Sequence, residues 1–429
     1  MKKNIIKPSI LPGFMELLPR EQEIFNDIVN KIISVYERNG CLAIDTPIIE
    51  KSEVLLAKSG GETEKHVYSF KKGKNDLSLR FDLTVPFARY VAQYYNELTF
   101  PLKRYQYGKV YRGERNQKGR YREFYQCDID VIGKGNLSIY NDAWVISLAS
   151  KAFKELGLPN FEFQISNRKI LKGVLEELNI INDVEVMILI DKYDKIGKDT
   201  FQEEMETLIG KDKSKYICNL INASGTNEEI YSLLVNLKIE NKSFNDGLYE
   251  LKKVTDTLKS IGVEDKEYRI NLRIIRGLDY YTGTVFETFL LGNENYGSIC
   301  SGGRYENLAE NYTTNVLPGV GISIGVTRLF FVLKEIGFVD NYNIKKKLEY
   351  LIIPVGDTIE YCCKVMKRLE KKGYGVTIYF EEDSVKKKMN YANKIGVKNV
   401  IIIGDEEVST GNLKVKNMIT GDVTIMMEE

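Results

Sequence analysis

The chain has 429 residues, of which 43% are hydrophobic and 28% are charged, and its formal net charge is +1. This composition is typical of a globular protein with two or three domains and argues against disorder. No apolar run approaches about 18 residues, so the sequence predicts no membrane-spanning helix, and the basic N-terminus lacks the apolar core of a secretion signal. Because the net charge is close to zero, a nucleic-acid partner would have to bind a local basic patch.

The cysteines and the histidine exclude several kinds of catalytic site. The six cysteines form no C-x-x-C pair, and several lie in apolar runs, which is typical of free thiols in a reducing compartment. We therefore expect a cytoplasmic protein. His66 is the single histidine, and no G-x-S-x-G setting surrounds it, so a Ser-His-Asp or Cys-His nucleophile is not expected. A zinc site would lack its usual imidazoles and paired thiols. We expect His66 to be an ordinary surface or interface residue, and the sequence identifies no metal ligands.

Helices and strands alternate in the first part of the chain. Apolar residues at helical spacing predict a helix over 18–39. The segment 41–50, CLAIDTPIIE, follows as a strand, and Pro47 cannot donate to a ladder, so we expect this strand at a sheet edge or a subunit boundary. Residues 77–95 predict a strand, a turn and a helix.

A hairpin and a further helix are predicted next. Residues 104–112 and 122–133 predict two antiparallel strands around the charged loop 113–121. Residues 142–157 predict an amphipathic helix. The strand FEFQIS then ends before Asn167, which could cap the helix that follows it.

The remaining chain divides into three parts. Residues 180–262 are helix-rich and lack strand signals, so we interpret them as an inserted helical module. Strand-like sequence resumes at 268–291, and residues 318–337 predict a strand, a glycine turn and a helix. After a boundary at 344–350, the sequence alternates as a compact α/β domain with a mixed sheet. This last domain has no glycine-rich phosphate fingerprint, so we do not expect it to bind a nucleotide.

Residues 110–133, VYRGERNQKGRYREFYQCDIDVIG, join a run of cations to a strand that carries an amide and two carboxylates. A period of two places Gln126, Asp128 and Asp130 on one face, and the alternate residues form an apolar face that belongs in a core. Taken alone, the polar face is equally typical of the solvated side of an antiparallel sheet.

Three other segments favour a binding site over a solvated face. LRFDLT supplies Asp82 beside Thr84, RGLDYYTG places Arg276 before two tyrosines, and GVGISIGVTRLF brings Arg328 into a glycine-dense turn before a helix. Acids, amides, phenols and arginines on separate strands of one sheet would suit a substrate that carries an amine, a carboxylate and a triphosphate.

These segments resemble the motifs of a known family. YRGERNQKGRYREFYQ is similar to motif 2 of the class II aminoacyl-tRNA synthetases, GISIGVTRLF to motif 3, and the first helix with the Pro47 strand to motif 1. RGLDYYTGTVFE and SGGRYENL closely resemble the histidyl-tRNA synthetase family. The resemblance runs from about residue 8 nearly to the end of the chain.

The resemblance implies an α+β fold with an antiparallel sheet flanked by helices. It implies a catalytic domain at 1–179 and 263–340, a helical insertion at 180–262 and an α/β anticodon-binding-like domain at 348–429. The implied reaction activates L-histidine with ATP to histidyl-adenylate and transfers the histidyl group to the 3′ end of histidine tRNA. Mg²⁺ is expected with ATP, and a homodimer is expected through motif 1.

The resemblance also implies roles for single residues. Arg112 would bind the α-phosphate and Arg276 would stabilise charge from the opposite side, which makes these two the catalytic residues. The implied ATP-binding residues are Arg112, Glu114, Phe124 and Arg328. The implied histidine-binding residues are Asp82, Leu83, Thr84, Arg112, Gln126, Asp130, Arg276, Tyr280 and Tyr281. The implied tRNA-binding residues are Arg115, Gln117, Lys386 and Lys387, the last two in a basic patch with Lys388 and Lys394.

One relative in this family offers a non-enzymatic alternative. A paralogue serves as the histidine-sensing regulatory subunit of ATP phosphoribosyltransferase, usually without an anticodon-binding domain and with the RGLDYYTG arginine altered. The presence of Arg112, Arg276, Arg328 and a full C-terminal domain favours the enzyme. A different class II amino-acid specificity would lack the paired tyrosines in this context.

Overall fold

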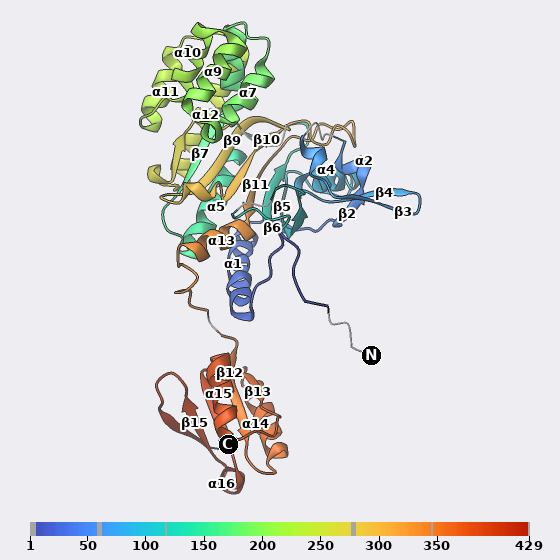
Figure 1. Cartoon of the computed structure of the whole chain (residues 1–429), viewed down its shortest axis with the longest axis vertical. Helices are drawn as coiled ribbons and strands as arrows, with labels where there is room; N and C mark the ends of the chain where they lie inside the picture. The colour runs from blue at the N-terminus through green and yellow to red at the C-terminus, as the bar shows by residue number, and fades with distance from the viewer. Residues whose placement is uncertain (1–5, 58–61, 116–117, 276–279, 345, 428–429) are drawn as a thin grey trace. The chain divides into compact units, whose positions relative to one another are not determined.

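The computed structural model describes residues 6–57, 62–115, 118–275, 280–344 and 346–427. The chain forms two compact units, Met1–Tyr342 and Asn343–Glu429 (Figure 1). Within the described residues, the helices are too short or too polar to cross a membrane.

The first unit is built on a largely antiparallel sheet, which has eight strands among the described residues. In spatial order the strands are β1 (Leu42–Ala43), β5 (Leu102–Tyr111), β6 (Glu123–Ile132), β11 (Gly319–Gly325), β10 (Cys300–Tyr305), β9 (Tyr281–Leu290), β7 (Phe161–Asn167) and β8 (Tyr268–Ile270). The two outermost pairs, β1·β5 and β7·β8, are parallel. Because the spatial order departs from the chain order, strands far apart in sequence lie side by side at the centre of the sheet.

The central strand β6 has two buried faces of different chemistry. Its apolar face, with Cys127, Ile129 and Val131, is fully buried as expected. The opposite face carries Asp128 and Asp130, which are each only 2% exposed. The interpretation of this polar face as the solvated side of a sheet is therefore wrong. The predicted hairpin of β5 and β6 is confirmed, and its register pairs Arg104 directly with Asp130.

Three helices cover the apolar face of the central strands. They are α1 (Pro19–Arg38), α5 (Tyr140–Leu156) and α13 (Val326–Glu335). Phe25 of α1 packs against Tyr125 of β6 and Phe330 of α13, with ring centroids 5.5 and 5.4 Å apart. Pro19 opens α1, where a missing N–H carries no penalty, and α5 ends at Gly157 in a left-handed conformation. The helices predicted at 18–39 and 142–157 are thus confirmed.

The single strand predicted at 41–50 is wrong. The segment divides into β1, at the edge of the large sheet, and β2 (Ile49–Lys51), which joins a separate sheet in the order β2-β4-β3. Pro47 lies between the two strands and cannot donate to a ladder, which explains the break. The small sheet is completed by β3 (Ser69–Lys72) and β4 (Asn75–Leu79). Helix α2 (Ser52–Leu55) contacts β2, β4 and α4 (Thr84–Gln93), and α3 (Glu62–Lys65) precedes β3 in the chain.

Residues 183–260 contain only helices in the described part of the chain. After α6 (Arg168–Glu177) come α7 (Asp183–Asp191), α8 (Tyr193–Ile196), α9 (Lys198–Ile209), α10 (Lys211–Ile221), α11 (Asn227–Asn236) and α12 (Lys242–Ser260). Figure 1 shows most of these helices gathered at one end of the unit, near β7 and β9. The predicted cap is confirmed, because the Asn167 side chain accepts a hydrogen bond from Lys169 N at 3.0 Å. Two short 3₁₀ helices, Asp265–Glu267 and Glu294–Tyr296, complete the unit.

The second unit is a three-layer α/β fold around a mixed sheet. The sheet order is β13 (Gly375–Ile378), β12 (Leu348–Pro354), β14 (Asn399–Ile403), β15 (Asn412–Asn417) and β16 (Val423–Met427). Strand β12 is parallel to both of its neighbours, and β14, β15 and β16 are antiparallel. Helix α14 (Ile359–Lys371) packs on one face and α15 (Val385–Ile395) on the other. The predicted alternation is confirmed, and a short helix that was not predicted, α16 (Asp405–Thr410), precedes β15.

Candidate active site

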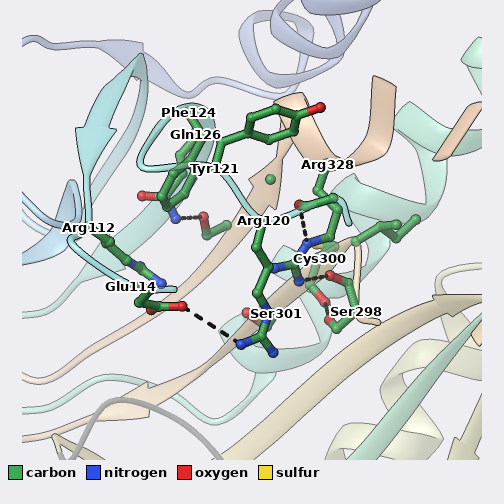
Figure 2. A pocket seen from close by; sticks show the side chains of 14 residues that line it. Arg112, Glu114, Arg120, Tyr121, Phe124, Gln126, Ser298, Cys300, Ser301 and Arg328 are labelled. Carbon is green, nitrogen blue, oxygen red and sulfur yellow. Dashed lines mark hydrogen bonds and ion pairs between the residues drawn. The ribbon is translucent and has the colours of Figure 1, made fainter. Parts of the chain in front are cut away.

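A pocket opens over the polar face of the large sheet (Figure 2). It contains about 620 Å³ of space, part of which is open solvent. The loop after β5, the strands β6, β10 and β11 and the start of α13 contribute its walls. The lining includes all four residues expected to bind ATP, together with the expected histidine ligand Gln126.

The pocket concentrates positive charge. The Nε of Arg328 donates to Gly119 O at 3.2 Å and its Nη1 donates to Ser298 O at 2.8 Å, so the side chain spans the pocket from the loop to the edge of β10. Burial, followed by the charges of Arg120 and Arg112, lowers the pKa of Arg328 to about 10. Glu114 only partly offsets these cations through an ion pair with Arg120 at 3.7 Å. A bound polyanion would relieve this repulsion.

Arg112 connects this pocket to a second group of predicted residues. Its Nε donates to Phe81 O at 3.0 Å, next to Asp82, and its guanidinium lies over the ring of Phe124, 5.1 Å from the centroid. The following residue, Gly113, donates its N–H to His66 O at 2.7 Å. The single histidine therefore supports the loop through its backbone.

Asp82 lies at the start of α4, where its charge complements the helix N-terminus. Its Oδ1 accepts a hydrogen bond from Val85 N at 3.0 Å, and its Oδ2 accepts one from Tyr280 Oη at 3.4 Å. Burial raises the pKa of Asp82, and the Val85 amide, Arg112 and Tyr280 oppose the rise. The Asp82–Thr84 turn and the paired tyrosines, which are far apart in sequence, thus meet in the folded chain.

Asp130 lies deeper on the same sheet face and forms a buried ion pair with Arg104. Its Oδ1 accepts a hydrogen bond from Tyr305 Oη at 2.9 Å. Tyr280 packs against Tyr281 with ring centroids 4.8 Å apart and against Tyr305 at 6.0 Å. The aromatic residues and Asp130 therefore form one continuous cluster.

Sequence reasoning missed Arg104 and Tyr305. Arg104 is 0% exposed, and besides Asp130 it donates to Leu83 O and to Gln106 Oε1, each at 3.4 Å. The period of two in LKRYQYGKVY places Arg104 on one face with Gln106. The hairpin register was needed to show that this face is the one carrying Asp130.

Glycines of β11 make room for this cluster. A Cβ at Gly321 would lie 2.0 Å from Asp130 Oδ1, and a Cβ at Gly319 would lie 2.3 Å from the ring of Tyr305. Any larger residue would displace the carboxylate or the phenol. The glycine-dense segment GVGISIG is therefore explained by close packing under the acid cluster.

Asp128 is next but one to Asp130 on the same face of β6, and it forms no ion pair of its own among the described residues. Burial raises the pKa of Asp128 to about 7 and that of Asp130 to about 6, and Arg104 opposes both shifts. Asp82 also lies near enough to raise both pKa values. In the described part of the chain, Oδ1 of Asp128 has no hydrogen-bond partner.

None of the described residues expected to bind tRNA lines this pocket. Arg115 is exposed on the loop after β5, and Lys386 and Lys387 are exposed on α15 in the second unit. The placement of Lys388 in an exposed basic patch is wrong, because its side chain is buried and Nζ donates to Pro354 O at 2.9 Å. Arg276 and Gln117 lie outside the described residues. No cluster of three or more His, Cys, Asp or Glu side chains suited to a metal ion occurs among the described residues.

Comparisons with known proteins agree with these motifs. The family model described as Histidyl-tRNA synthetase matches residues 13–329, and the one described as Anticodon binding domain matches residues 349–429. A histidine–tRNA ligase of Clostridium acetobutylicum is 64% identical over 419 residues, covering 98% of this chain and 97% of the relative.

Solved structures extend the comparison to the fold. The crystal structure of a histidyl-tRNA synthetase from Nostoc sp. PCC 7120 matches with a TM-score of 0.89 and 35% identity, covering 99% of this chain and 97% of that one. An ATP phosphoribosyltransferase regulatory subunit/histidyl-tRNA synthetase from Bacillus halodurans matches with a TM-score of 0.76 at 20% identity, over 92% and 99% of the two chains. This second likeness concerns the fold alone.

The buried ion pair leads to a prediction about stability. Replacing Arg104 with Met should lower the free energy of unfolding of the first unit by roughly 3–5 kcal/mol, because Asp130 is left as an uncompensated buried charge. The double change Arg104→Met with Asp130→Asn should lower the free energy of unfolding clearly less than Arg104→Met alone. Urea unfolding followed by the fluorescence of Trp144, the single tryptophan, measures both. Equal losses in the single and double variants would contradict the pairing.

The raised pKa of Asp128 leads to a prediction about pH. An acid whose folded pKa is about 7 and whose unfolded pKa is near 4 loses stability as the pH rises between these values. Asp128→Asn removes this loss, so the variant should be more stable than the unmodified chain, by up to about 4 kcal/mol. The gain should be larger at pH 8 than at pH 5. A gain that is the same at both pH values in Trp144-monitored unfolding would contradict the raised pKa.

Proposed function

Because this chain belongs to the histidyl-tRNA synthetase family, it is a histidine–tRNA ligase, and we propose that the pocket described above is where histidine reacts with ATP. The enzyme activates L-histidine with ATP to histidyl-adenylate and transfers the histidyl group to the 3′ end of histidine tRNA. Its close relatives are ligases, which supports this activity over the regulatory alternative. The observation that carries the site proposal is Arg112, which connects the cationic pocket to the Asp82 turn.

The first reaction needs positive charge and alignment in place of a base. The carboxylate of histidine, already an anion, attacks the α-phosphorus of ATP, a new C–O–P linkage forms, and pyrophosphate leaves with the electrons of the broken P–O bond. We assign Arg112 to the α-phosphate and Arg276 to the opposite side of the reacting group. Guanidinium groups suit both roles, because their donor fork matches phosphate oxygens and they remain charged.

The cationic pocket fits the nucleotide. We assign Phe124 and Arg328 to the two faces of adenine and Glu114 to the nucleotide edge of the site. The lowered pKa of Arg328 supports a polyanionic ligand, because phosphate oxygens would offset the repulsion among Arg328, Arg120 and Arg112. The Arg112 guanidinium lies over the Phe124 ring, and we expect ATP to draw it to the phosphate. Mg²⁺ is expected to arrive bound to ATP, held mainly by phosphates and waters.

The acid and aromatic cluster fits histidine. We assign the α-ammonium to Asp82, Thr84 and Gln126, and the imidazole to Asp130, Tyr280 and Tyr281. Leu83 lies between these groups, with its carbonyl held by Arg104. A neutral imidazole has one donor and one acceptor, so a carboxylate can take its N–H and a phenol can donate to the bare nitrogen. An amino acid without these groups would leave buried polar atoms unpaired, which gives strong discrimination.

We assign tRNA recognition to two separate regions. Arg115 and Gln117 would meet the acceptor end, and Lys386 and Lys387 would contact the tRNA backbone from the second unit. The proposed domains are the catalytic domain at 1–179 and 263–340, the helical insertion at 180–262 and the anticodon-binding domain at 348–429. We also propose a cytoplasmic homodimer joined through motif 1, which is supported by the exposed apolar side chains of Leu42, Ile48 and Ile49.

The catalytic assignment predicts a selective loss of rate. Arg276→His should reduce histidine-dependent ATP–pyrophosphate exchange on the order of 10²–10³-fold, because a group that stabilises the transition-state charge is removed. Equilibrium binding of histidine should largely survive. Arg273→His is the matched control, since Arg273 pairs with Asp194 at 3.0 Å in the helical region, and its exchange rate should stay near that of the unmodified enzyme. An unchanged rate in Arg276→His would refute the assignment.

The tRNA assignment predicts a loss confined to the second step. Changing Lys386 and Lys387 to Glu should weaken tRNA binding in charging assays, and the salt dependence should become shallower by about one unit of slope per lysine. Histidine-dependent pyrophosphate exchange should not change. The same charge reversal at Lys364 and Lys367, exposed on α14, is the matched control. If both pairs of changes weaken charging equally, the effect is one of net charge and the specific contact is wrong.

A further inference from the structure

Gln126 has one hydrogen bond and one unused acceptor. Its Nε2 donates to Ser323 Oγ at 2.7 Å (Figure 2). Its Oε1 is buried and has no hydrogen-bond partner among the described residues. A buried acceptor without a partner is unfavourable unless a ligand donates to it. Gln126 lines the pocket, so a donor on the substrate is the available partner.

The orientation of this amide depends on the hydroxyl of Ser323. A hydroxyl can donate to the oxygen of an amide or accept from its nitrogen, so Ser323 alone would allow Gln126 to turn over. We expect Asp128 to determine which of these two orientations the Gln126 amide adopts. Asp128 lies directly opposite Ser323 in the pairing of β6 with β11, and the Ser323 hydroxyl opposes the rise in the pKa of Asp128.

An ionised carboxylate can only accept hydrogen bonds. When Asp128 is ionised, Ser323 would donate its proton to that carboxylate, and its oxygen would be left to accept from the Gln126 nitrogen. Burial raises the pKa of Asp128 to about 7 and the charge of Arg104 opposes this rise, and an ammonium group entering the pocket would favour the ionised form further. The direction of each hydrogen bond in the chain Gln126–Ser323–Asp128 is thereby fixed.

We propose that Asp128 and Ser323 are positioning residues that hold the Gln126 amide with Oε1 toward the pocket, where it accepts a hydrogen bond from the substrate's α-ammonium. The proposal rests on the role assigned above to Gln126. With the amide turned over, its N–H₂ group would face the ammonium and repel it. The pair thus selects ligands that carry the α-ammonium over analogues that lack it.

A purely structural role explains these residues less well. Asp128 is buried, and within the part of the chain that the structure describes it forms no ion pair and one of its oxygens has no hydrogen-bond partner. Two apolar residues at these paired positions would avoid the desolvation of a carboxylate. A carboxylate at this position is explained if it sets the direction in which the Ser323 hydroxyl donates its hydrogen bond.

The test compares two ligands in the full-length enzyme. Ser323→Ala and Asp128→Ala should weaken L-histidine roughly 10- to 100-fold, measured as KM in pyrophosphate exchange and as Kd by calorimetry, with little change in kcat. The affinity for 3-(imidazol-4-yl)propionate, which lacks the α-amine, should not change. Ser323→Thr keeps the hydroxyl and should keep the affinity for histidine. Ser150→Ala is the control, because it removes a buried hydrogen bond to Glu267 of 2.6 Å elsewhere in the same unit.

A double variant tests whether Ser323 acts through Gln126. The double variant Gln126→Ala with Ser323→Ala should bind histidine no more weakly than Gln126→Ala alone, because Ser323 acts through the amide. Additive losses, or equal losses for both ligands, would overturn the proposal. The proposal would also be overturned if the Ser323→Ala variant bound histidine with normal affinity while the Gln126→Ala variant bound it more weakly. Normal affinity in Gln126→Ala itself would instead remove the role assigned to Gln126, and the orientation proposal with it.

Discussion

The buried ion pair between Arg104 and Asp130 is the interaction on which the polar face of the large sheet depends. Asp82 raises the pKa values of both Asp128 and Asp130, and Asp130 also raises that of Asp128. The buried charge of Arg104 lowers the pKa values of all three acids. Its other hydrogen bonds, to Leu83 O and Gln106 Oε1, tie the turn before α4 and the neighbouring strand to the same guanidinium. Removing this charge would leave three acids to repel one another in a closely packed space that exists only because β11 has glycines there.

The site has a cationic part and an acidic part, and the charges of these two parts are opposite to those of the groups that each would bind. Arg112, Arg120 and Arg328 surround one part, where repulsion and burial depress the pKa of Arg328. The carboxylates occupy the other part, where burial raises their pKa values. In the proposed assignment the triphosphate enters the cationic part, while the ammonium and imidazole enter the acidic part. The reacting carboxylate and α-phosphate then meet at Arg112, which lies between the two.

The sequence predicted the individual helices, strands and caps better than the contacts between segments that are far apart in the chain. The hairpin, the helices that cover the apolar face and the cap at Asn167 follow from local periodicity and side-chain chemistry, and they were confirmed. The break at Pro47 was not foreseen, because a proline forbids a ladder hydrogen bond without showing whether the chain continues at an edge or leaves the sheet. Arg104, Tyr305 and Ser323 were missed for a different reason. Each acts on a residue of another segment, and only the register of β5, β6, β10 and β11 shows which residues meet.

The same reasoning explains why a single histidine suffices in this chain. The chemistry of adenylate formation requires no side chain to remove a proton, so the site can consist of groups that keep their charge or only orient hydrogen bonds. Such groups act at fixed distances, and fixed distances require a rigid support. Strand β6 provides it, because helices cover its apolar face while β5 and β11 flank it on both edges. The orientation of one amide, set by a serine and an aspartate on two of these strands, is the kind of discrimination that only a support of this rigidity can maintain.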